Sequence, residues 1–331
     1  MMQNSAGVSI IVCCYNSAKR LPKTLFHLAK QNITKGIEVI IVDNNSSDDT
    51  AEVAKSLWEE LNNPFPLRIA FEAQPGLTKA REKGIEVALY DYLIFCDDDN
   101  WLDENYAINT MQLFDADEEI MILGGQGNPV FESDKPFWFE NFYQSYAVGK
   151  QEVKSGFVSL VYGAGLGIRK TILKNPKFYA IPFFLNDRVG TRLSSGGDSE
   201  TCLRVKLLGG KIFYSEKLTF YHFLTTNRLT WKYLQNLHIG FSYSFVPLHV
   251  YDLVLNGSKL PEFYWLKKSF LYFARTIKYS FLHFHNIIKN KEGDVKTIHI
   301  KSWMILGFEF LRYNKQIKKM YKDISTLKFD D

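Results

Sequence analysis

The stretch Tyr92–Asn100, YLIFCDDDN, joins five strand-forming residues to three consecutive aspartates. Adjacent carboxylates repel each other, so such a cluster needs a cation or many hydrogen bonds. Hard divalent ions such as Mg²⁺ and Mn²⁺ prefer oxygen ligands, typically one or two carboxylates plus substrate phosphates. Ligands of open α/β sheets bind beyond the carboxyl ends of the strands. The stretch therefore predicts a metal and diphosphate site; the alternative is a solvated acidic turn.

Strand and helix patterns alternate before the aspartates. Continuous apolar runs, typical of strands buried on both faces, occur at 8–13, 38–42 and 67–71. Helical patterns lie between them, at 21–28, 48–61 and 76–90. This alternation predicts an α/β fold with a doubly wound, mostly parallel sheet whose strands are joined by crossover helices.

Composition limits the class of protein. The chain has 331 residues, 46% of them hydrophobic, which is ample for one large domain with an appendage. Its four cysteines have no spacing that suggests zinc or a disulfide framework, so a reducing compartment is expected. The first five residues lack the basic flank of a secretory signal, and no uncharged apolar run is long enough to span a membrane. We therefore expect a cytoplasmic protein.

Charge divides the chain into two regions. Residues 231–331 hold 16 Lys+Arg and 8 Asp+Glu, whereas residues 1–230 hold 24 and 28. The C-terminal region is predicted to be helical, and one apolar stripe recurs in it every three or four residues: Phe263, Leu266, Phe270, Phe273, Ile277, Phe281, Phe284 and Ile288. We expect a domain over 1–230 and a helical extension over 231–331. The stripe either contacts a membrane surface or packs on the domain or a second subunit.

The sequence lacks the motifs of several enzyme classes. The first strand runs into Cys14-Tyr15-Asn16 without the glycine-rich turn of dinucleotide-binding domains. The chain also has no Walker A loop and no G-x-S-x-G elbow. A dehydrogenase is therefore not expected, and no nucleic-acid partner is predicted.

Five stretches, in order, carry a resemblance to a known family. They are 8–16 (VSIIVCCYN), 38–50 (EVIIVDNNSSDDT), 76–85 (GLTKAREKGI), the aspartates 97–99, and 163–169 (GAGLGIR) followed by 196–200 (GGDSE). Together they resemble the inverting family 2 glycosyltransferases of bacterial glycan biosynthesis, with the GT-A fold, over roughly residues 7–223. The resemblance implies a hexosyltransferase-type enzyme that moves one sugar from a nucleotide-diphosphate sugar to a hydroxyl of a glycan or lipid-linked acceptor. It also implies Mg²⁺ or Mn²⁺ as cofactor.

The resemblance assigns donor contacts to the ends of the first strands. Tyr15, Asn16 and Asp43 would bind the nucleoside, where a carboxylate can accept from a pyrimidine N–H. For Asp43 the alternative is a turn-forming residue. Arg81 would reach the diphosphate or brace the aspartates, unless it is simply a surface arginine of its helix.

The aspartate run resembles the family's Asp-X-Asp element. Asp99 is the predicted metal ligand, and Asp97 and Asp98 compete for the second place beside the donor diphosphate. His222 corresponds to a position that ligates the metal in some family members; the alternative is a packed core histidine.

The catalytic base would be Asp198, from an element that is Gly-Glu-Asp-X-Glu in the family and has Gly197 for the first glutamate here. The resemblance implies that Asp198 takes the acceptor's proton and that Glu200 orients the acceptor. Asp198 is alternatively a helix N-cap. Trp138 and Trp231 would stack on sugar faces or lie in the core.

Two rival functions remain open. A sugar-1-phosphate nucleotidyltransferase usually needs a glycine-rich basic loop after the first strand, where this chain has only Lys19 and Arg20. A non-catalytic glycan-binding protein is the second rival, which the unusual Gly197 keeps open. Processive synthases carry Gln-X-X-Arg-Trp and spanning helices, and the run 227–231 resembles that motif only superficially. We therefore expect single addition, at the inner face of the cell membrane if the helical extension contacts it.

Overall fold

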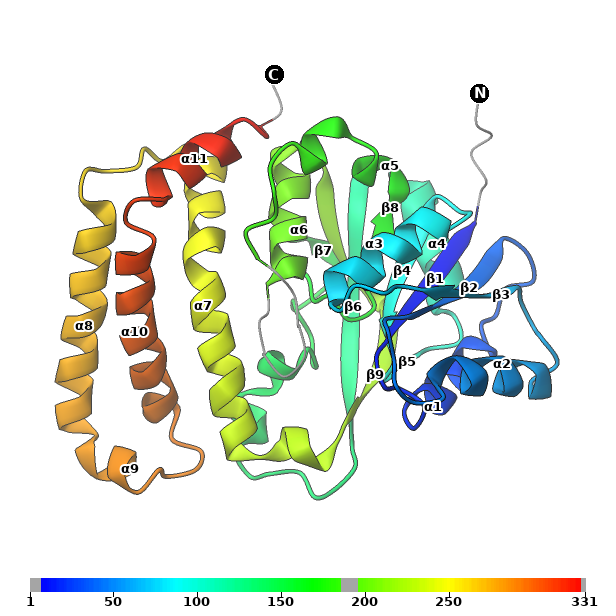
Figure 1. Ribbon diagram of the computed structural model, residues 1–331, viewed down its shortest axis with the longest axis horizontal. Helices are drawn as coiled ribbons and strands as arrows, with labels where there is room; N and C mark the ends of the chain where they lie inside the picture. Colours follow the sequence, from blue (N-terminus) through cyan, green and yellow to red (C-terminus); the bar gives the residue numbers. More distant parts are fainter. Residues whose placement is uncertain (1–6, 186–195, 329–331) are drawn as a thin grey trace.

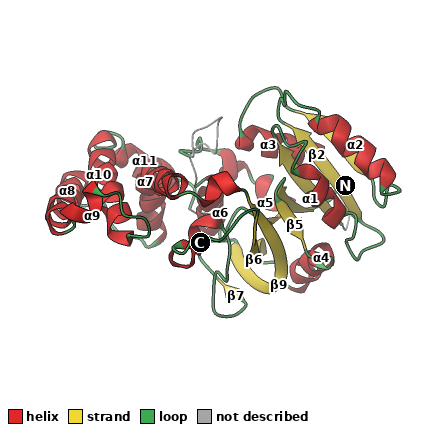
Figure 2. Cartoon of the chain, turned by 90° about the horizontal axis from the view of Figure 1, so that it is seen from below, coloured by secondary structure: helices red, strands yellow, loops and turns green. Residues whose placement is uncertain are grey.

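The computed structural model describes residues 7–185 and 196–328, which form one mixed sheet with helices on both faces and a helical extension (Figures 1 and 2). The strands are β1 (Val8–Cys14), β2 (Ile37–Asp43), β3 (Leu67–Phe71), β4 (Tyr92–Asp97), β5 (Asn100–Leu102), β6 (Ile120–Phe131), β7 (Gly156–Phe157), β8 (Gly167–Arg169) and β9 (Lys211–Leu224). The helices of the sheet domain are α1 (Leu21–Leu28), α2 (Thr50–Glu60), α3 (Leu77–Val87), α4 (Tyr106–Ala116), α5 (Lys170–Leu173) and α6 (Gly197–Leu207). Those of the extension are α7 (Trp231–Leu255), α8 (Tyr264–Leu282), α9 (Phe284–Ile288), α10 (Val295–Arg312) and α11 (Ile317–Ser325).

The first half of the sheet is parallel, as the sequence predicts. Strands β3, β2, β1 and β4 are neighbours in that order, and all three pairings between them are parallel. The four predicted apolar runs correspond to these four strands. Their central residues in β1 and β2 are fully buried because helices cover both faces of the sheet.

The second half of the sheet is mixed. Among the described strands, β8 is antiparallel to both β4 and β6, and β5 and β7 are antiparallel to β9, while β6 and β9 are parallel. The sheet is therefore less parallel than the sequence predicts. The reason is local: the regular strand–helix alternation ends after α4, and the short strand β8 inserts antiparallel between β4 and β6.

Alternate residues of β1 belong to two separate cores. Ile10 and Val12 pack with buried residues of α1, α2 and α4, whereas Ile11 packs with Ala80 of α3 and residues of α6. This period of two places α3 and α6 on the same face of the sheet. The two helices carry Arg81 and Asp198, which are distant in sequence.

The extension stands beside α6. Leu203 and Leu207 of α6 share a core with apolar residues of α7, α8, α10 and α11. Figure 1 shows α7 next to the sheet domain and α8 at the outer edge, with α10 between them. Within the described residues, no helix has both the length and the apolarity required to cross a bilayer.

Candidate functional site

The carboxyl ends of β1, β2 and β4 meet at one edge of the sheet. Cys14 pairs in register with Asp43, and Cys13 pairs with Asp97. This alignment brings the loop after β1, the loop after β2 and the aspartate run to the same edge. Three stretches that are far apart in sequence thereby form one polar surface, where the ligand of such a sheet is expected.

Asn16 and Asp43 shape the loops at this edge. Asn16 has a left-handed backbone (φ +50°), which asparagine tolerates better than most residues. Its side-chain oxygen accepts a 2.8 Å hydrogen bond from the backbone N–H of Ser47. Asp43 Oδ1 accepts from the backbone N–H of Ser46 at 3.0 Å, so Asp43 also makes the turn that was its alternative role. Tyr15 precedes Asn16 in the loop after β1, and 54% of its surface is exposed.

Asn44 is a structural residue that sequence reasoning missed. Its side-chain amide donates to the carbonyls of Glu72 (3.1 Å) and Gln74 (2.7 Å), and its oxygen accepts from the N–H of Gly76 (2.7 Å). Gly76 directly precedes α3 and has φ +134°, a value that side chains disfavour. Asn44 thus fixes the start of the helix that carries Arg81. The sequence did contain a signal for this role: two asparagines, Asn44 and Asn45, directly follow the end of a buried strand pattern.

Asp98 faces α1, and its carboxylate contacts residues at the start of that helix. Its carboxylate accepts from the Ser17 hydroxyl and pairs with Arg20, whose Nη2 lies 2.6 Å from Oδ2. Thr24 donates to the Asp98 carbonyl at 2.8 Å. Burial raises the pKa of Asp98, with a further contribution from the nearby Asp99 charge, and the contact with Arg20 opposes this rise. Asp98 is therefore engaged by a cation, as Asp99 is by Arg228.

Asp99 is almost fully buried (3% exposed) and lies against Arg228 and His222. Arg228 Nη1 is 2.8 Å from Oδ2 of Asp99, and His222 Nε2 is 3.5 Å from Oδ1. The same Nη1 lies 3.1 Å from His222 Nε2, so the three side chains form one cluster. The pKa of Arg228 is raised, chiefly by the Asp99 charge. Sequence reasoning predicted Asp99 and His222 and missed Arg228, which belongs to the run 227–231.

Asp99 and Asp97 carry the oxygen atoms that a hard divalent ion prefers, and Arg228 shares one of the Asp99 oxygens. Within the described residues, no three His, Cys, Asp or Glu side chains are arranged to hold a metal by themselves. Mg²⁺, however, commonly takes only one or two carboxylates from the protein and the rest of its ligands from phosphates and water. Asp99 and Asp97, which is partly exposed at the end of β4, supply oxygen ligands of this kind.

Asp198 lies at the start of α6 and is held by backbone groups. The N–H of Gly163 donates to Oδ2 at 2.8 Å, and the N–H of Ser199 donates to Oδ1 at 2.7 Å. The helix N-cap is Gly196 with φ +110°, so the N-cap alternative for Asp198 is wrong and the aspartate lies in the first turn. Its negative charge is favourable there because the helix dipole is positive at this end.

Arg81, on α3, lies close to Asp198. A Cβ atom on Gly163 would lie 3.0 Å from Asp198 Oδ2 and 3.2 Å from Arg81 Nη2, so both side chains close over this glycine. The Arg81 guanidinium also stands 5.3 Å from the centroid of the Phe95 ring. A cavity of about 70 Å³ adjoins Arg81, Phe95 and Asp198, with otherwise mainly apolar walls. Arg81 is thus not a plain surface arginine.

Glu200 is fully buried, and this position corrects its predicted contact with the acceptor. Its carboxylate accepts from the N–H groups of Phe184 (3.0 Å) and Leu185 (2.8 Å), and from the Tyr251 hydroxyl of α7 (2.8 Å). It also pairs with Arg204, which is equally buried, at 3.1 Å. The carboxylate therefore ties α6 to α7 and to residues 184 and 185, and it does not line the Asp198 cavity.

Trp138 is also core, contrary to its predicted stacking on a sugar. It is 1% exposed, and its ring packs edge-on against Trp231 at 5.4 Å between centroids. Trp231 is 3% exposed and begins α7, so both tryptophans hold the extension to the sheet domain. Neither the sheet domain nor the extension alone would cover these rings, so their contact removes a large aromatic surface from water.

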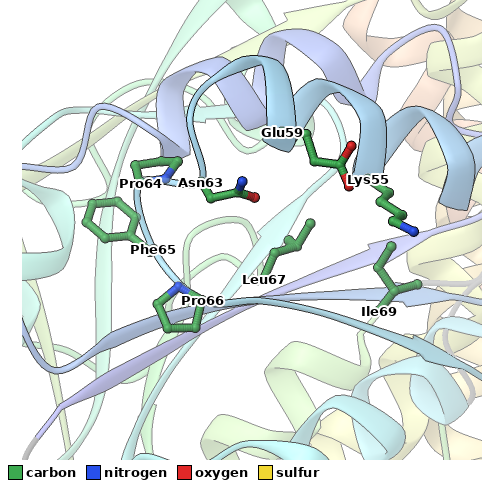
Figure 3. Close-up of a pocket in the computed structure, with 8 residues that line it drawn as sticks. All are labelled: Lys55, Glu59, Asn63, Pro64, Phe65, Pro66, Leu67 and Ile69. Carbon is green, nitrogen blue, oxygen red and sulfur yellow. The ribbon is translucent and has the colours of Figure 1, made fainter.

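A larger groove lies away from these residues. Figure 3 shows it between α2 and the edge strand β3, with a volume of about 560 Å³. It is lined by Lys55, Glu59, Asn63, Pro64, Phe65, Pro66, Leu67 and Ile69. None of the predicted site residues contributes to it. We place the candidate site at the strand ends and the smaller cavity because the carboxylates and their cations gather there.

The chain is similar to known glycosyltransferases in sequence and in fold. The family described as Glycosyl transferase family 2 matches residues 9–175. The glycosyltransferase GlyG of Streptococcus pneumoniae is 29% identical over 141 residues, which cover 43% of this chain and 46% of that protein. A poly-beta-1,6-N-acetyl-D-glucosamine synthase of Staphylococcus aureus is 29% identical over 123 residues, 37% of this chain and 28% of the synthase. The chain thus matches less than half the length of these curated relatives.

Solved structures share the fold over nearly the whole chain. S. aureus TarS 1-349 in complex with UDP-GlcNAc superposes with a TM-score of 0.52 at 17% identity, over 97% of this chain and 90% of that one. The mannosyltransferase PcManGT from Pyrobaculum calidifontis, in complex with GDP-Man and Mn²⁺, gives 0.54 at 14% identity, over 97% and 73%. At these identities the likeness establishes the GT-A fold.

Proposed function

Because the chain belongs to glycosyl transferase family 2, we propose that it transfers a single sugar, with inversion, from a nucleotide-diphosphate sugar to a hydroxyl of a glycan or lipid-linked acceptor. The position of Asp198 carries the proposal. This carboxylate is held by two backbone N–H groups beside a cavity and next to Arg81. A base fixed in this way can act without first reorganising.

In the proposed reaction, Asp198 accepts the proton of the acceptor hydroxyl while the oxygen attacks C1 of the sugar. The new bond joins that oxygen to C1, and the bond from C1 to the diphosphate breaks on the opposite face of the sugar. The electron pair leaves with the nucleoside diphosphate. Arg81 approaches Asp198 across Gly163. We propose that its long side chain extends from there towards the donor diphosphate, where its charge would stabilise the departing phosphates.

The donor would lie along the strand-end edge. We infer that residues 1–230 bind donor and acceptor, with Tyr15, Asn16 and Asp43 around the nucleoside and Asp97 near the diphosphate. The loops of Asn16 and Asp43 are pinned to Ser47 and Ser46, which supports this role because a pinned loop loses little entropy on binding.

We propose that the reaction depends on Mg²⁺ or Mn²⁺, with Asp99 and Asp97 as protein ligands and His222 beside them. When bound, the ion would neutralise charge on the departing diphosphate. Arg228 and His222 hold the Asp99 carboxylate in place at 2.8 and 3.5 Å. Support comes from the fold neighbour that contains GDP-Man and Mn²⁺.

For the acceptor side, we infer that Glu200 and Trp138 act through the structure around them. Glu200 fixes residues 184–185, whose Leu185 lines the cavity beside Asp198. We also propose that the enzyme works at the cytoplasmic face of a membrane through residues 231–331. None of its four cysteines, all within the described residues, forms a disulfide, as a reducing compartment favours.

Thermal shift against UDP-, GDP-, dTDP- and CMP-sugars, with and without Mn²⁺, tests the donor site directly. A ligand that binds only the folded protein raises the apparent stability by mass action, so one nucleotide class should raise Tm, and more so with Mn²⁺. Release of nucleoside diphosphate from that donor then tests turnover. If a donor binds but no nucleoside diphosphate is released, with or without the acceptors tried, a non-catalytic protein is favoured. If no nucleotide sugar raises Tm, the donor site is contradicted.

A further inference from the structure

Helix α8 and the following α9 present an apolar stripe to solvent. Phe270, Ile277 and Phe281 are 75%, 72% and 85% exposed. The other exposed members are Phe263, Leu266, Phe284 and Ile288. These seven residues, called the α8–α9 stripe below, are three, four or seven positions apart, so that those on α8 lie along one side of that helix. Figure 1 shows α8 at the outer edge of the molecule.

The opposite face of α8 is fixed to α10. Ser269 is buried and donates to the carbonyl of Gly307 at 2.8 Å, and Tyr272 stacks on Phe310 at 5.7 Å between ring centroids. Phe273, predicted as part of the stripe, instead packs edge-on against Phe308 at 5.0 Å. Because these contacts set the rotation of α8, the stripe cannot turn inward without breaking them. Packing of the stripe on the sheet domain is therefore excluded in this fold.

The charge around the stripe is of one sign. Residues 263–291 contain six Lys or Arg and no Asp or Glu. Lys267 and Lys278 are exposed on α8, and Lys289 follows α9. Two copies meeting through this surface would bring like charges together, whereas an anionic lipid headgroup would be attracted to it. The charge pattern thus favours a lipid surface over a second subunit.

We propose that the α8–α9 stripe is a docking surface for an anionic bilayer, with the helices lying in the plane of the interface. The stripe would enter the acyl boundary while the flanking lysines contact headgroups. Helix α8 alone, with 19 residues, extends over about 28 Å at the helical rise of about 1.5 Å per residue. The proposal rests on the proposed function in one respect: a lipid-linked acceptor would be found at this surface.

Flotation of the full chain with vesicles of phosphatidylglycerol and phosphatidylcholine tests the docking surface. The wild type should float at low salt, and less at high salt because screening weakens headgroup attraction. It should not float with vesicles of phosphatidylcholine alone. The variant Phe270→Ser, Ile277→Asn, Phe281→Ser should bind at least about a hundredfold more weakly, because burying each of these side chains is worth more than 1 kcal/mol and about 1.4 kcal/mol is tenfold.

A matched control carries Leu89→Ser and Val153→Asn, which are exposed apolar residues of the sheet domain (57% and 88%). It should float like the wild type. A second variant, Lys267→Gln, Lys278→Gln, keeps the stripe and should show a measurably weaker salt dependence, because two of the six basic residues are removed. Equal Tm values would show that all variants are folded, as expected for exposed side chains.

Three results would overturn the proposal: a wild type that stays in solution with anionic vesicles, a stripe variant that floats as well as the wild type, or a vesicle-free dimer that the stripe variant dissociates. The last would assign the stripe to a second copy. Release of nucleoside diphosphate in solution, measured on the same preparations, separates this test from the proposed function. Loss of flotation with normal release would affect only the docking surface, and flotation without release would affect only the enzymatic proposal.

Discussion

The sheet domain and the helical extension bury their apolar residues in different ways. The central residues of β1 and β2 are entirely enclosed because helices cover both faces of the sheet. In the extension, α8 buries one side on α10 and leaves a row of phenylalanines and isoleucines in water. A continuous apolar run in a strand therefore indicates burial on both faces, whereas an apolar stripe on a helix can be buried in the core or left exposed on the surface. The tertiary packing of α8 decides between them.

Helix α6 is where the two regions meet, and two carboxylates on it point in different directions. Asp198 adjoins the cavity beside the sheet. Glu200, two residues later, is enclosed between α6 and α7 and accepts from Tyr251. Positions two apart on a helix do not share a face. We therefore expect a substitution of Asp198 to affect the chemistry, and a substitution of Glu200 to affect the stability of the junction between α6 and α7.

Asp198→Asn should give the largest effect. Asparagine retains an oxygen for the N–H groups of Gly163 and Ser199 but cannot accept a proton, so turnover should fall on the order of 10²- to 10⁴-fold. Steady-state rates of donor turnover with acceptor measure this, and Tm should be nearly unchanged. An Asn variant with a rate near the wild type would remove Asp198 from the role of base and leave it a purely structural residue.

Glu200→Gln should mainly lower stability. The substitution leaves the Arg204 guanidinium without its ion-pair partner, and both side chains are fully buried. Breaking a buried pair typically costs about 3–5 kcal/mol; the shape-conserving Gln should lie near the lower end. Urea unfolding measures the loss, and kcat per folded molecule should stay within a few-fold of the wild type. A stable variant with a strongly raised KM for acceptor would restore the direct acceptor contact that this geometry argues against.

These two carboxylates also show what the sequence could predict. The order of apolar runs specified the parallel half of the sheet, and the motif around 196–200 indicated the helix that carries Asp198. The sequence could not tell that Glu200 faces α7, because the period of a helix reveals which residues share a side but not what covers it. Arg228 was missed for another reason: its partner Asp99 lies far away in the chain, and only the pairing of β5 with β9 brings the two regions together.

Asp99→Asn tests the polar edge of the sheet domain. Removing one anionic ligand should lower metal-dependent turnover on the order of 10²-fold, since a bound metal contributes several kcal/mol and about 1.4 kcal/mol is tenfold. Stability should also fall, because Arg228 loses a buried partner. Asp98→Asn is the matched control: Asp98 also pairs with an arginine, Arg20, but is not one of the proposed metal ligands, so its loss should lower metal-dependent turnover less.

Water-proton relaxation with Mn²⁺ and nucleoside diphosphate separates the two effects of Asp99→Asn. The variant should show weakened metal binding at a temperature where it remains folded. If Asp99→Asn binds Mn²⁺ as the wild type does while Asp98→Asn does not, the ligand assignment must move from Asp99 to Asp98. A lower Tm without a change in metal binding would instead leave Asp99 as a purely structural partner of Arg228.

The smallest expected effect is a pH dependence confined to the extension. Burial lowers the pKa of His238 on α7 to about 4, with a further contribution from His299, and burial also lowers the pKa values of His249 and His299. Between about pH 6.5 and pH 4 the unfolded chain binds more protons than the folded one at these groups, so the free energy of unfolding falls as the pH falls. His238 also lies 3.1 Å from the Ser145 hydroxyl of the sheet domain. Solvent screening reduces the contribution of this partly exposed ring, and we expect about 1 kcal/mol from it.

Urea unfolding at several pH values, with amide exchange on α7, measures how the free energy of unfolding depends on pH. The substitution His238→Gln should make this dependence weaker. Identical slopes in the two proteins would mean that acid acts elsewhere and that the junction between the two regions is indifferent to pH.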